Sequence, residues 1–157
     1  MTPRWRNSAH TETKSSGQWT PPTPELADGV HIRRVEITNV LYAFARLADE
    51  GTIDEIGGLL ADDVEWAMTG TTWRGRAGVL AGLQSMRDLG YAGPASGHRH
   101  VITNMEVHVD GDHTIARSYF LLVSRDTPAT ILAVGAYRDE LRRTGDGWLI
   151  TKREITT

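Results

Sequence analysis

The sequence predicts an α+β fold in which one curved antiparallel β-sheet wraps over three helices. In the first half of the chain, apolar residues recur mainly at the spacing of amphipathic helices, with one short strand pattern among them. In the second half, four long segments with strand character follow one another and are separated by turn signals. An α/β fold with a parallel sheet would alternate strands and helices throughout, so this order favours α+β.

The first helix is expected from about His31 to Asp49. Its buried face is marked by apolar residues at helical spacing, namely Ile37, Val40, Leu41, Phe44, Leu47 and Ala48. Gly51 follows as a natural helix end. A second helix is expected to begin at once, because Thr52 and Glu55 have the spacing of a capping box. Its expected apolar face consists of Ile53, Ile56, Leu59 and Leu60.

A strand pattern follows, since Val64, Trp66 and Met68 alternate with less apolar residues. A turn region around Gly70 and Gly75 then leads to a third helix. Its apolar stripe is Val79, Leu80, Leu83 and Met86. After a loop through residues 93–97, the four long strands are expected at about Arg99–Val109, Thr114–Ser124, Thr130–Arg142 and Trp148–Ile155. Turn residues at 110–112 and 144–147 separate the first from the second strand and the third from the fourth.

Residues 1–29 are expected to form a disordered tail, and residues 30–157 to form one folded domain. The tail is polar and rich in turn residues, including the prolines at 21, 22 and 24. Such a segment cannot bury enough apolar surface to offset the entropy that ordering would cost.

Composition excludes several classes of function. A net charge of −3 and a pI near 6.0 give no reason to expect a nucleic-acid partner. The absence of cysteine excludes disulfides, iron–sulfur clusters and thiol nucleophiles. The sequence has neither a signal peptide nor an apolar run long enough to cross a bilayer, so we expect a cytoplasmic protein without a membrane partner. Dinucleotide-binding, Walker A, serine-hydrolase and zincin motifs are also absent from the sequence, and we expect no cofactor.

Asp49 is the first candidate catalytic residue. It lies at the C-terminal end of the first predicted helix, where a carboxylate faces the negative end of the helix dipole. This placement costs a few tenths to about 1 kcal/mol. An unfavourable placement without visible compensation is a place to look for function. From position alone, a solvated acid at a helix end is the commoner explanation.

The second candidate is the strand that begins at residues 97–104. In a regular strand His98, His100, Ile102 and Asn104 share one face, and polar groups interleaved with isoleucine suit a pocket wall. An edge strand with a wetted face is the alternative. The His-x-His pair also suits a metal ion, but no third ligand has a supporting spacing, and we expect no metal site.

Further candidate substrate contacts are the aromatic residues Tyr42, Trp66, Tyr119 and Tyr137. Taken singly, each is explained as well by packing in a core or an interface. Arg153, on the last predicted strand, is a candidate anion contact, with an exposed charge as the alternative.

Three blocks of the sequence resemble SnoaL-like domains of the nuclear transport factor 2-like superfamily. They are Leu47–Gly51 with Leu60–Trp66, His98–Asn104, and Gly135–Leu141 with Gly147–Ile150. The resemblance extends from about residue 31 to residue 157. It implies a cystatin-like fold, with a curved antiparallel sheet and three helices enclosing a cone-shaped pocket, in agreement with the predicted order of elements.

The enzymes of this superfamily that the sequence resembles in pattern are scytalone dehydratase, hexachlorocyclohexane dehydrochlorinase and the bile-acid 7α-dehydratases. The resemblance implies that Asp49 and His100 form a catalytic dyad and that Trp66 lines the pocket. It therefore implies a cofactor-independent lyase, isomerase or cyclase that removes a proton from a small hydrophobic or aromatic substrate. Ala48 and Ser118 stand where scytalone dehydratase has a tyrosine and a second histidine, which argues against scytalone as the substrate.

Two other functions remain open at this point. One is a non-catalytic ligand-binding or assembly subunit, like the β-subunits of ring-hydroxylating dioxygenases. The other is an epoxide-hydrolase-like enzyme in which Asp and Arg groups activate water. Related domains associate through the open face of the sheet, so the resemblance also implies a homodimer or homotrimer.

Overall fold

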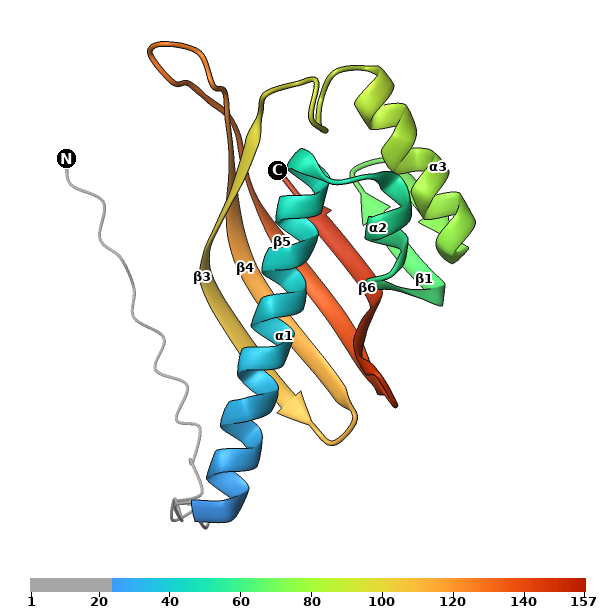
Figure 1. Cartoon of the computed structure of the whole chain (residues 1–157), viewed down its shortest axis with the longest axis vertical. Coiled ribbons are helices and arrows are strands. Elements are labelled where there is room, and N and C mark those ends of the chain that lie inside the picture. Colours follow the sequence, from blue (N-terminus) through green and yellow to red (C-terminus); the bar gives the residue numbers. More distant parts are fainter. Residues whose placement is uncertain (1–23) are drawn as a thin grey trace, which may run out of the picture.

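The computed structural model describes residues 24–157, so residues 1–23 of the predicted tail lie outside the described residues. Its elements are α1 (Pro24–Glu50), α2 (Ile53–Gly57), β1 (Leu60–Met68), β2 (Thr71–Arg74), α3 (Gly75–Asp88), β3 (Arg99–Asp110), β4 (His113–Val123), β5 (Ile131–Thr144) and β6 (Gly147–Thr156). The six strands form one sheet in the order β2-β1-β6-β5-β4-β3 (Figure 1). This architecture confirms the predicted α+β class. Among the described residues, no helix is both long and apolar enough to span a membrane.

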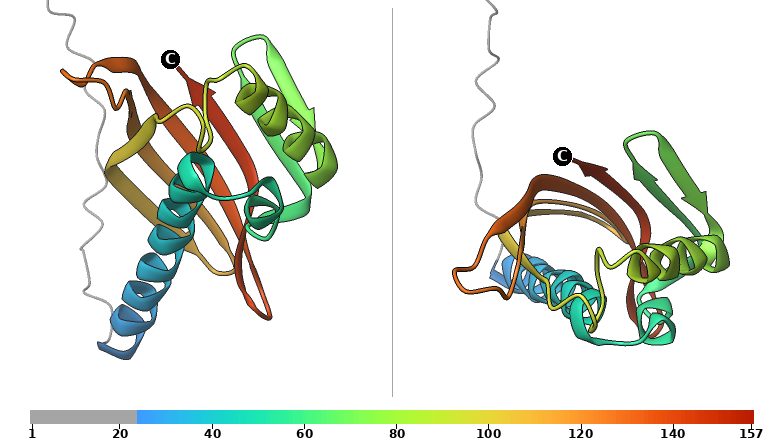
Figure 2. Two further views of the ribbon diagram at one scale, coloured as in Figure 1. Left: turned by 45° about the horizontal axis from the view of Figure 1, so that its top comes forward. Right: turned by 90° about the horizontal axis from the view of Figure 1, so that it is seen from above.

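The sheet curves, and the helices lie on its concave side (Figure 2). The apolar stripe of α1 faces the sheet, and Ile37, Leu41 and Phe44 are at most 4% exposed. On the sheet, Leu141 of β5 and Ile150 of β6 lie directly opposite each other and belong to the same buried cluster. The core therefore lies between α1 and the inner face of the strands.

The four predicted C-terminal strands are present as β3 to β6, each bounded within two residues of the prediction. They pair antiparallel in chain order. β1 instead pairs in parallel with β6, which is the one exception to the antiparallel pairing of the described strands. β2 was predicted as part of a turn region. It is four residues long and mostly exposed, so it has no apolar alternation that would have revealed it.

Two helix predictions were wrong in their bounds. α1 begins at Pro24 instead of His31, so residues 24–29 belong to a helix and not to a tail. Proline is favoured in the first turn of a helix, and these turns project beyond the sheet (Figure 1), where no apolar stripe is needed. α2 ends at Gly57, and Leu60 belongs to β1, where it pairs with Ile150. Burial in the sheet overrides its helical spacing, whereas the capping box of Thr52 and Glu55 is confirmed.

The outer face of the sheet carries an apolar patch. Val101 of β3, Leu121 of β4 and Val134 of β5 form one row across three neighbouring strands. Val101 is 45% exposed and Val134 59%, and the neighbouring Tyr119 is 58% exposed. These four residues are called the outer patch below. Successive side chains in a strand point to opposite faces, so the patch lies on the side away from the helices.

Candidate active site

Asp49 lies in the last turn of α1 and is only 4% exposed, so it is not the solvated acid that its position alone suggested. The helix ends one residue later at Glu50, and the Gly51 N–H still donates to the Leu47 carbonyl at 2.9 Å, as in a last helical turn. A Cβ atom at residue 51 would lie 2.5 Å from the Leu47 Cδ2 atom and 3.0 Å from the Leu47 Cα atom, so the close approach to Leu47 favours glycine. The turn holds the Asp49 carboxylate toward the beginning of β3.

His100, the second residue of β3, provides both donors for that carboxylate. Its ring Nδ1 lies 2.6 Å from Asp49 Oδ1, and its backbone N–H donates to Asp49 Oδ2 at 2.9 Å. An ionised carboxylate only accepts hydrogen bonds, so the neutral ring must carry its proton on Nδ1. The lone pair is then on Nε2, the nitrogen of the same ring that a base would use.

The His100 ring lines a cavity of about 150 Å³ between the inner face of the sheet and the helices α1 and α3. Most of the lining is apolar. It includes Leu41, Phe44, Ala45, Ala48, Met68, Trp73, Leu83, Met86, Leu122 and Ile155. The lining residues with polar side-chain atoms are Trp66, Tyr91, His100, Ser118, Tyr137, Asp139 and Arg153. An apolar cavity with a few polar groups is the common form of a small-molecule site.

A buried ion pair forms one wall of the cavity. Arg153 of β6 lies directly opposite Asp139 of β5 in the sheet, and its Nε and Nη2 donate to the two carboxylate oxygens at 2.6 and 2.9 Å. Both side chains are at most 3% exposed. Burial lowers the pKa of Arg153, but the charge and hydrogen bonds of Asp139 outweigh it and hold the pKa above its ordinary value. Arg153 is therefore positively charged at neutral pH, and the carboxylate that faces it is that of Asp139.

Aromatic rings connect this ion pair to His100. The Arg153 guanidinium carbon lies 4.4 Å from the centre of the Phe44 ring and 4.4 Å from that of Tyr137, which is within cation–π range. The Tyr137 ring stacks on Phe120 at 4.4 Å, and Phe120 lies 6.2 Å from the His100 ring. The Asp49–His100 contact and the ion pair are thus linked by a continuous series of aromatic rings.

Tyr137 remains a neutral phenol in this site. Burial raises its pKa to about 12, although the positive charge of Arg153 acts in the opposite direction. At neutral pH its hydroxyl is therefore available as a hydrogen-bond donor.

Trp66 lies opposite Arg153 in the β1–β6 pair and packs against Phe44, with 5.3 Å between ring centres. Its indole Nε1 is buried and has no hydrogen-bond partner in the described part of the chain. A buried donor of this kind is usually satisfied by an ordered water or a ligand oxygen.

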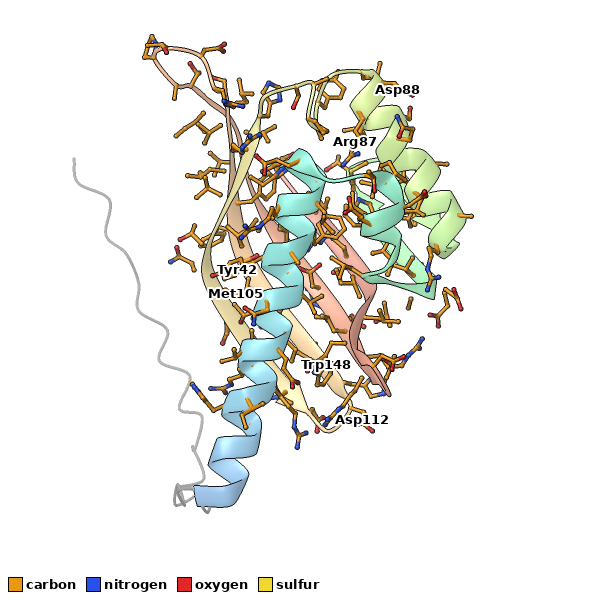
Figure 3. All side chains as sticks on the ribbon, viewed as in Figure 1. Tyr42, Arg87, Asp88, Met105, Asp112 and Trp148 are labelled. Atoms are coloured by element: carbon orange, nitrogen blue, oxygen red, sulfur yellow. The ribbon has the colours of Figure 1, made fainter. Side chains whose placement is uncertain are left out.

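Four of the predicted site residues line the cavity, namely Trp66, His100, Tyr137 and Arg153. Tyr42 instead lies on α1 (Figure 3) and is 43% exposed. It lines a separate surface pocket together with Asp49 and Arg99. His98 precedes β3, and its ring Nδ1 lies 3.2 Å from the Tyr91 carbonyl oxygen. The two histidines of the His-x-His pattern therefore have separate partners. The described residues contain no cluster of three or more His, Asp or Glu side chains suited to a metal ion.

Asn104 does not share a face with His100. The prediction of a shared face required a regular strand, and β3 is irregular at this point. Its φ is +50°, and the β3–β4 register shifts between Thr103 and Glu106, as in a β-bulge. The bulge turns Asn104 toward a hollow that Tyr119 also lines on the outer face. Neither residue is among those that line the cavity of His100.

Asp139 is the functional candidate that sequence reasoning missed. It occupies an inward position of β5 between Tyr137 and Leu141, both of which are buried. A charged residue at an inward strand position requires a partner, and that alternation was visible in the sequence. The partner itself was not, because Arg153 pairs with it only through the register of β5 and β6.

Comparisons with known proteins give one matching family model and several solved structures with a similar fold. The sequence model of the SnoaL-like domain matches residues 32–154. A comparison with curated proteins gives no match. Among solved structures, the chain is similar to an NTF2-like protein with a cystatin-like fold from Novosphingobium aromaticivorans, at 29% identity and a TM-score of 0.71, over 83% of this chain and 86% of that chain.

Two further solved structures are similar at 19% identity and show the fold alone. One is a provisionally named scytalone dehydratase from Novosphingobium aromaticivorans, with a TM-score of 0.69 over 83% of this chain and 87% of that chain. The other is ActVI-ORFA from Streptomyces coelicolor, with a TM-score of 0.65 over 78% of this chain and 95% of that chain.

Burial of Tyr137 predicts a loss of stability at alkaline pH. The unfolded phenol ionises near pH 10 and the folded one near pH 12, so the free energy of unfolding falls across this interval. Two pKa units correspond to about 3 kcal/mol. We expect Tyr137→Phe to remove this part of the pH dependence in urea unfolding between pH 9 and 12. The matched change of the exposed Tyr119 to Phe should keep the wild-type slope, and equal slopes for wild type and Tyr137→Phe would contradict the prediction.

Proposed function

The chain belongs to the SnoaL-like domain family, and on that premise we propose that it is a cofactor-independent enzyme in which His100 removes a proton from carbon. Dehydration, elimination of another leaving group, isomerisation and aldol-type cyclisation all begin with this step. The observation that carries the proposal is the bidentate contact of Asp49 with the Nδ1 and the backbone N–H of His100. It leaves the Nε2 lone pair free on a ring that lines an apolar cavity.

The proposed step breaks a C–H bond next to a carbonyl group and forms an N–H bond at His100 Nε2. The electron pair of the C–H bond moves onto the carbonyl oxygen as an enolate, or expels a leaving group from the next carbon. Asp49 remains ionised and stabilises the imidazolium that forms. General base catalysis of this kind contributes about 10²–10⁴-fold in rate.

Arg153 and Tyr137 are proposed to stabilise the negative charge that develops on the substrate oxygen. Arg153 uses two of its five N–H groups to bind Asp139, and both Arg153 and Tyr137 line the cavity. Donors fixed in a site that excludes water stabilise such charge without having to reorganise. Tyr42 and Asn104, the other predicted oxyanion contacts, lie outside the cavity lining.

The charges around the cavity favour a neutral substrate. With His100 neutral, Asp49 and Asp139 contribute two negative charges and Arg153 one positive charge, which leaves one net negative charge. A carboxylate substrate would lose its hydration and also meet this charge. The volume of the cavity limits the size of the substrate, because an apolar cavity of about 150 Å³ in another protein holds benzene. We therefore propose a small, neutral, hydrophobic or aromatic substrate.

The role of His100 is tested by the exchange of carbon-bound hydrogen. We expect the wild type to accelerate deuterium uptake at the methyl group of acetophenone in D₂O, followed by proton NMR. His100→Ala should lower this rate by about 10²–10⁴-fold. His98→Ala is the matched control, because His98 is not among the residues that line the cavity, and it should stay within about twofold. A His100→Ala rate within tenfold of wild type, or a wild type no faster than buffer across a set of neutral ketones, would remove His100 from the role of base.

The preference for a neutral ligand is tested with two probes of similar shape. Acetophenone and benzoate have nearly the same size, but only benzoate carries a charge at neutral pH. We expect benzoate to bind at least tenfold more weakly in calorimetric titrations, which corresponds to about 1.4 kcal/mol. Equal or tighter binding of benzoate would mean that Arg153 offers an unneutralised charge to the ligand.

The buried Asp139–Arg153 pair favours a second candidate function, the activation of water for addition to an epoxide. In that reaction a carboxylate takes a proton from water, and a nearby donor assists opening of the ring. The two proposals differ in the origin of the product oxygen. In ¹⁸O-labelled water, addition places the label in the product, whereas elimination or isomerisation does not.

The outer patch favours association with another chain, as in the assembly subunit considered above. We propose that a second copy of this chain covers the patch in a homodimer or homotrimer. Contiguous exposed apolar residues on one face commonly mark such a contact.

We expect light scattering to give a multiple of the chain mass for the wild type and the monomer mass for Val134→Glu, because the substitution buries a charge in the contact. Val35→Glu, at a valine that is 47% exposed on α1, should keep the wild-type mass. A monomeric wild type would contradict the homo-oligomer and leave a different protein as the partner.

A further inference from the structure

We propose that Arg87, at the end of α3, is a positioning residue that fixes the last turn of α1 and so directs the Asp49 carboxylate at His100. Its importance for the reaction rests on the proposed function, whereas its effect on the dyad is a separate, measurable property. Figure 3 shows Arg87 where the end of α3 meets the C-terminal end of α1.

The guanidinium group of Arg87 binds backbone carbonyls on both sides of Asp49. Its Nη2 donates to the Leu47 carbonyl at 2.8 Å and to the Ala48 carbonyl at 3.3 Å, and its Nη1 donates to the Gly51 carbonyl at 2.9 Å. The Leu47 carbonyl also accepts from the Gly51 N–H, and the Ala48 carbonyl from the Gly93 N–H. Arg87 adds its guanidinium to both of these contacts and joins them to the Gly51 carbonyl beyond the helix end. Arg87 therefore determines the path of the backbone that carries the carboxylate.

The positive charge of Arg87 also compensates the placement that made Asp49 conspicuous in the sequence. A carboxylate at the C-terminal end of a helix opposes the helix dipole, and a cation there is favourable. Burial lowers the pKa of Arg87, so the partly buried guanidinium depends on its carbonyl partners to replace lost hydration. The charge lies at the helix end without contributing to the hydrogen bonds that Asp49 makes to His100.

The loop that leads to His100 is attached to the same point. The Gly93 N–H donates to the Ala48 carbonyl at 3.0 Å, and Ala48 also accepts from Arg87. The φ of Gly93 is +86°, and a Cβ atom there would lie 3.0 Å from the Arg87 side-chain carbons. Arg87 thus packs against both segments that bring the dyad together, the end of α1 and the 89–97 loop before β3.

Lysine cannot reproduce this contact, because one ammonium nitrogen cannot reach the three carbonyls that the planar guanidinium binds through two nitrogens. If Arg87 only capped the helix, its substitution would change the stability of the fold and nothing else. Substitution of a positioning residue must also change which nitrogen of His100 carries the proton, because the contact with Asp49 fixes that choice.

The experiment compares wild type, Arg87→Met, Arg87→Lys and Arg76→Met in two measurements. The first is the ¹⁵N NMR signature of the His100 ring, which distinguishes the Nδ1–H from the Nε2–H form of the neutral ring. The second is deuterium exchange into acetophenone. Arg76 is the matched control, because it also lies on α3 and its guanidinium donates twice to a backbone carbonyl, that of Leu60, at 3.0 and 2.8 Å.

We expect the Nδ1–H form to predominate in wild type and in Arg76→Met, and a mixture of both forms in Arg87→Met and Arg87→Lys. Displacement of a reacting group by about 1 Å lowers rates by about 10²-fold, so we expect at least tenfold slower exchange in Arg87→Met. Arg76→Met should stay within about twofold. Arg87→Lys keeps the charge but not the geometry of the contact, and it gives the result if Arg87→Met does not fold.

An unchanged NMR signature in both Arg87 variants would overturn the proposal, whether or not the wild type is active. A changed signature in a protein that exchanges no hydrogen in wild type would support the positioning role and contradict the proposed function. A changed signature together with an unchanged exchange rate would contradict the link between Arg87 and the reaction.

Discussion

The Asp49 carboxylate joins the C-terminal end of α1 to the beginning of β3, and the geometry of the site depends on this junction. One oxygen binds the His100 ring and the other binds the His100 backbone, so the contact fixes the ring and the strand together. Because α1 also covers the inner face of the sheet, a helix that supplies much of the core supplies the catalytic candidate as well. A shift of α1 against the sheet would therefore also move the Asp49 carboxylate relative to His100.

The energy of the buried Asp139–Arg153 pair indicates whether it serves stability or function. A buried ion pair loses about as much hydration energy as its attraction returns, so an apolar pair of similar size is often equally stable or better by about 1–4 kcal/mol. Stability alone thus gives little reason to place these charges in an apolar wall. Their place in the cavity lining, with aromatic rings around the guanidinium, supports a role toward a bound molecule.

Much of the fold was predictable from local patterns, because alternation defines β3 to β6 and helical spacing defines α1 and α3. The capping box of Thr52 and Glu55 was predictable for the same reason, since it needs only two residues at a fixed spacing. Local patterns marked Asp49 and His100 as candidates, but their contact, which spans 51 residues, was predicted only through the resemblance to the family. Asn104 was misplaced because a bulge leaves no trace in an alternating pattern, and Asp139 was missed because its partner depends on strand register.

The Asp139–Arg153 pair also affects the order in which the domain can assemble. Asp139 precedes Arg153 by 14 residues, so it leaves the ribosome first. A sheet that packed against α1 before β6 was in place would bury a carboxylate without its cation, and an unpaired buried charge costs about 3–5 kcal/mol. Early closure of the core is therefore unfavourable. Because β6 pairs with both β5 and β1, its arrival joins the two halves of the sheet and gives Asp139 its cation in a single event. Partly synthesised chains are thus expected to remain open, and the cavity becomes a late product of folding.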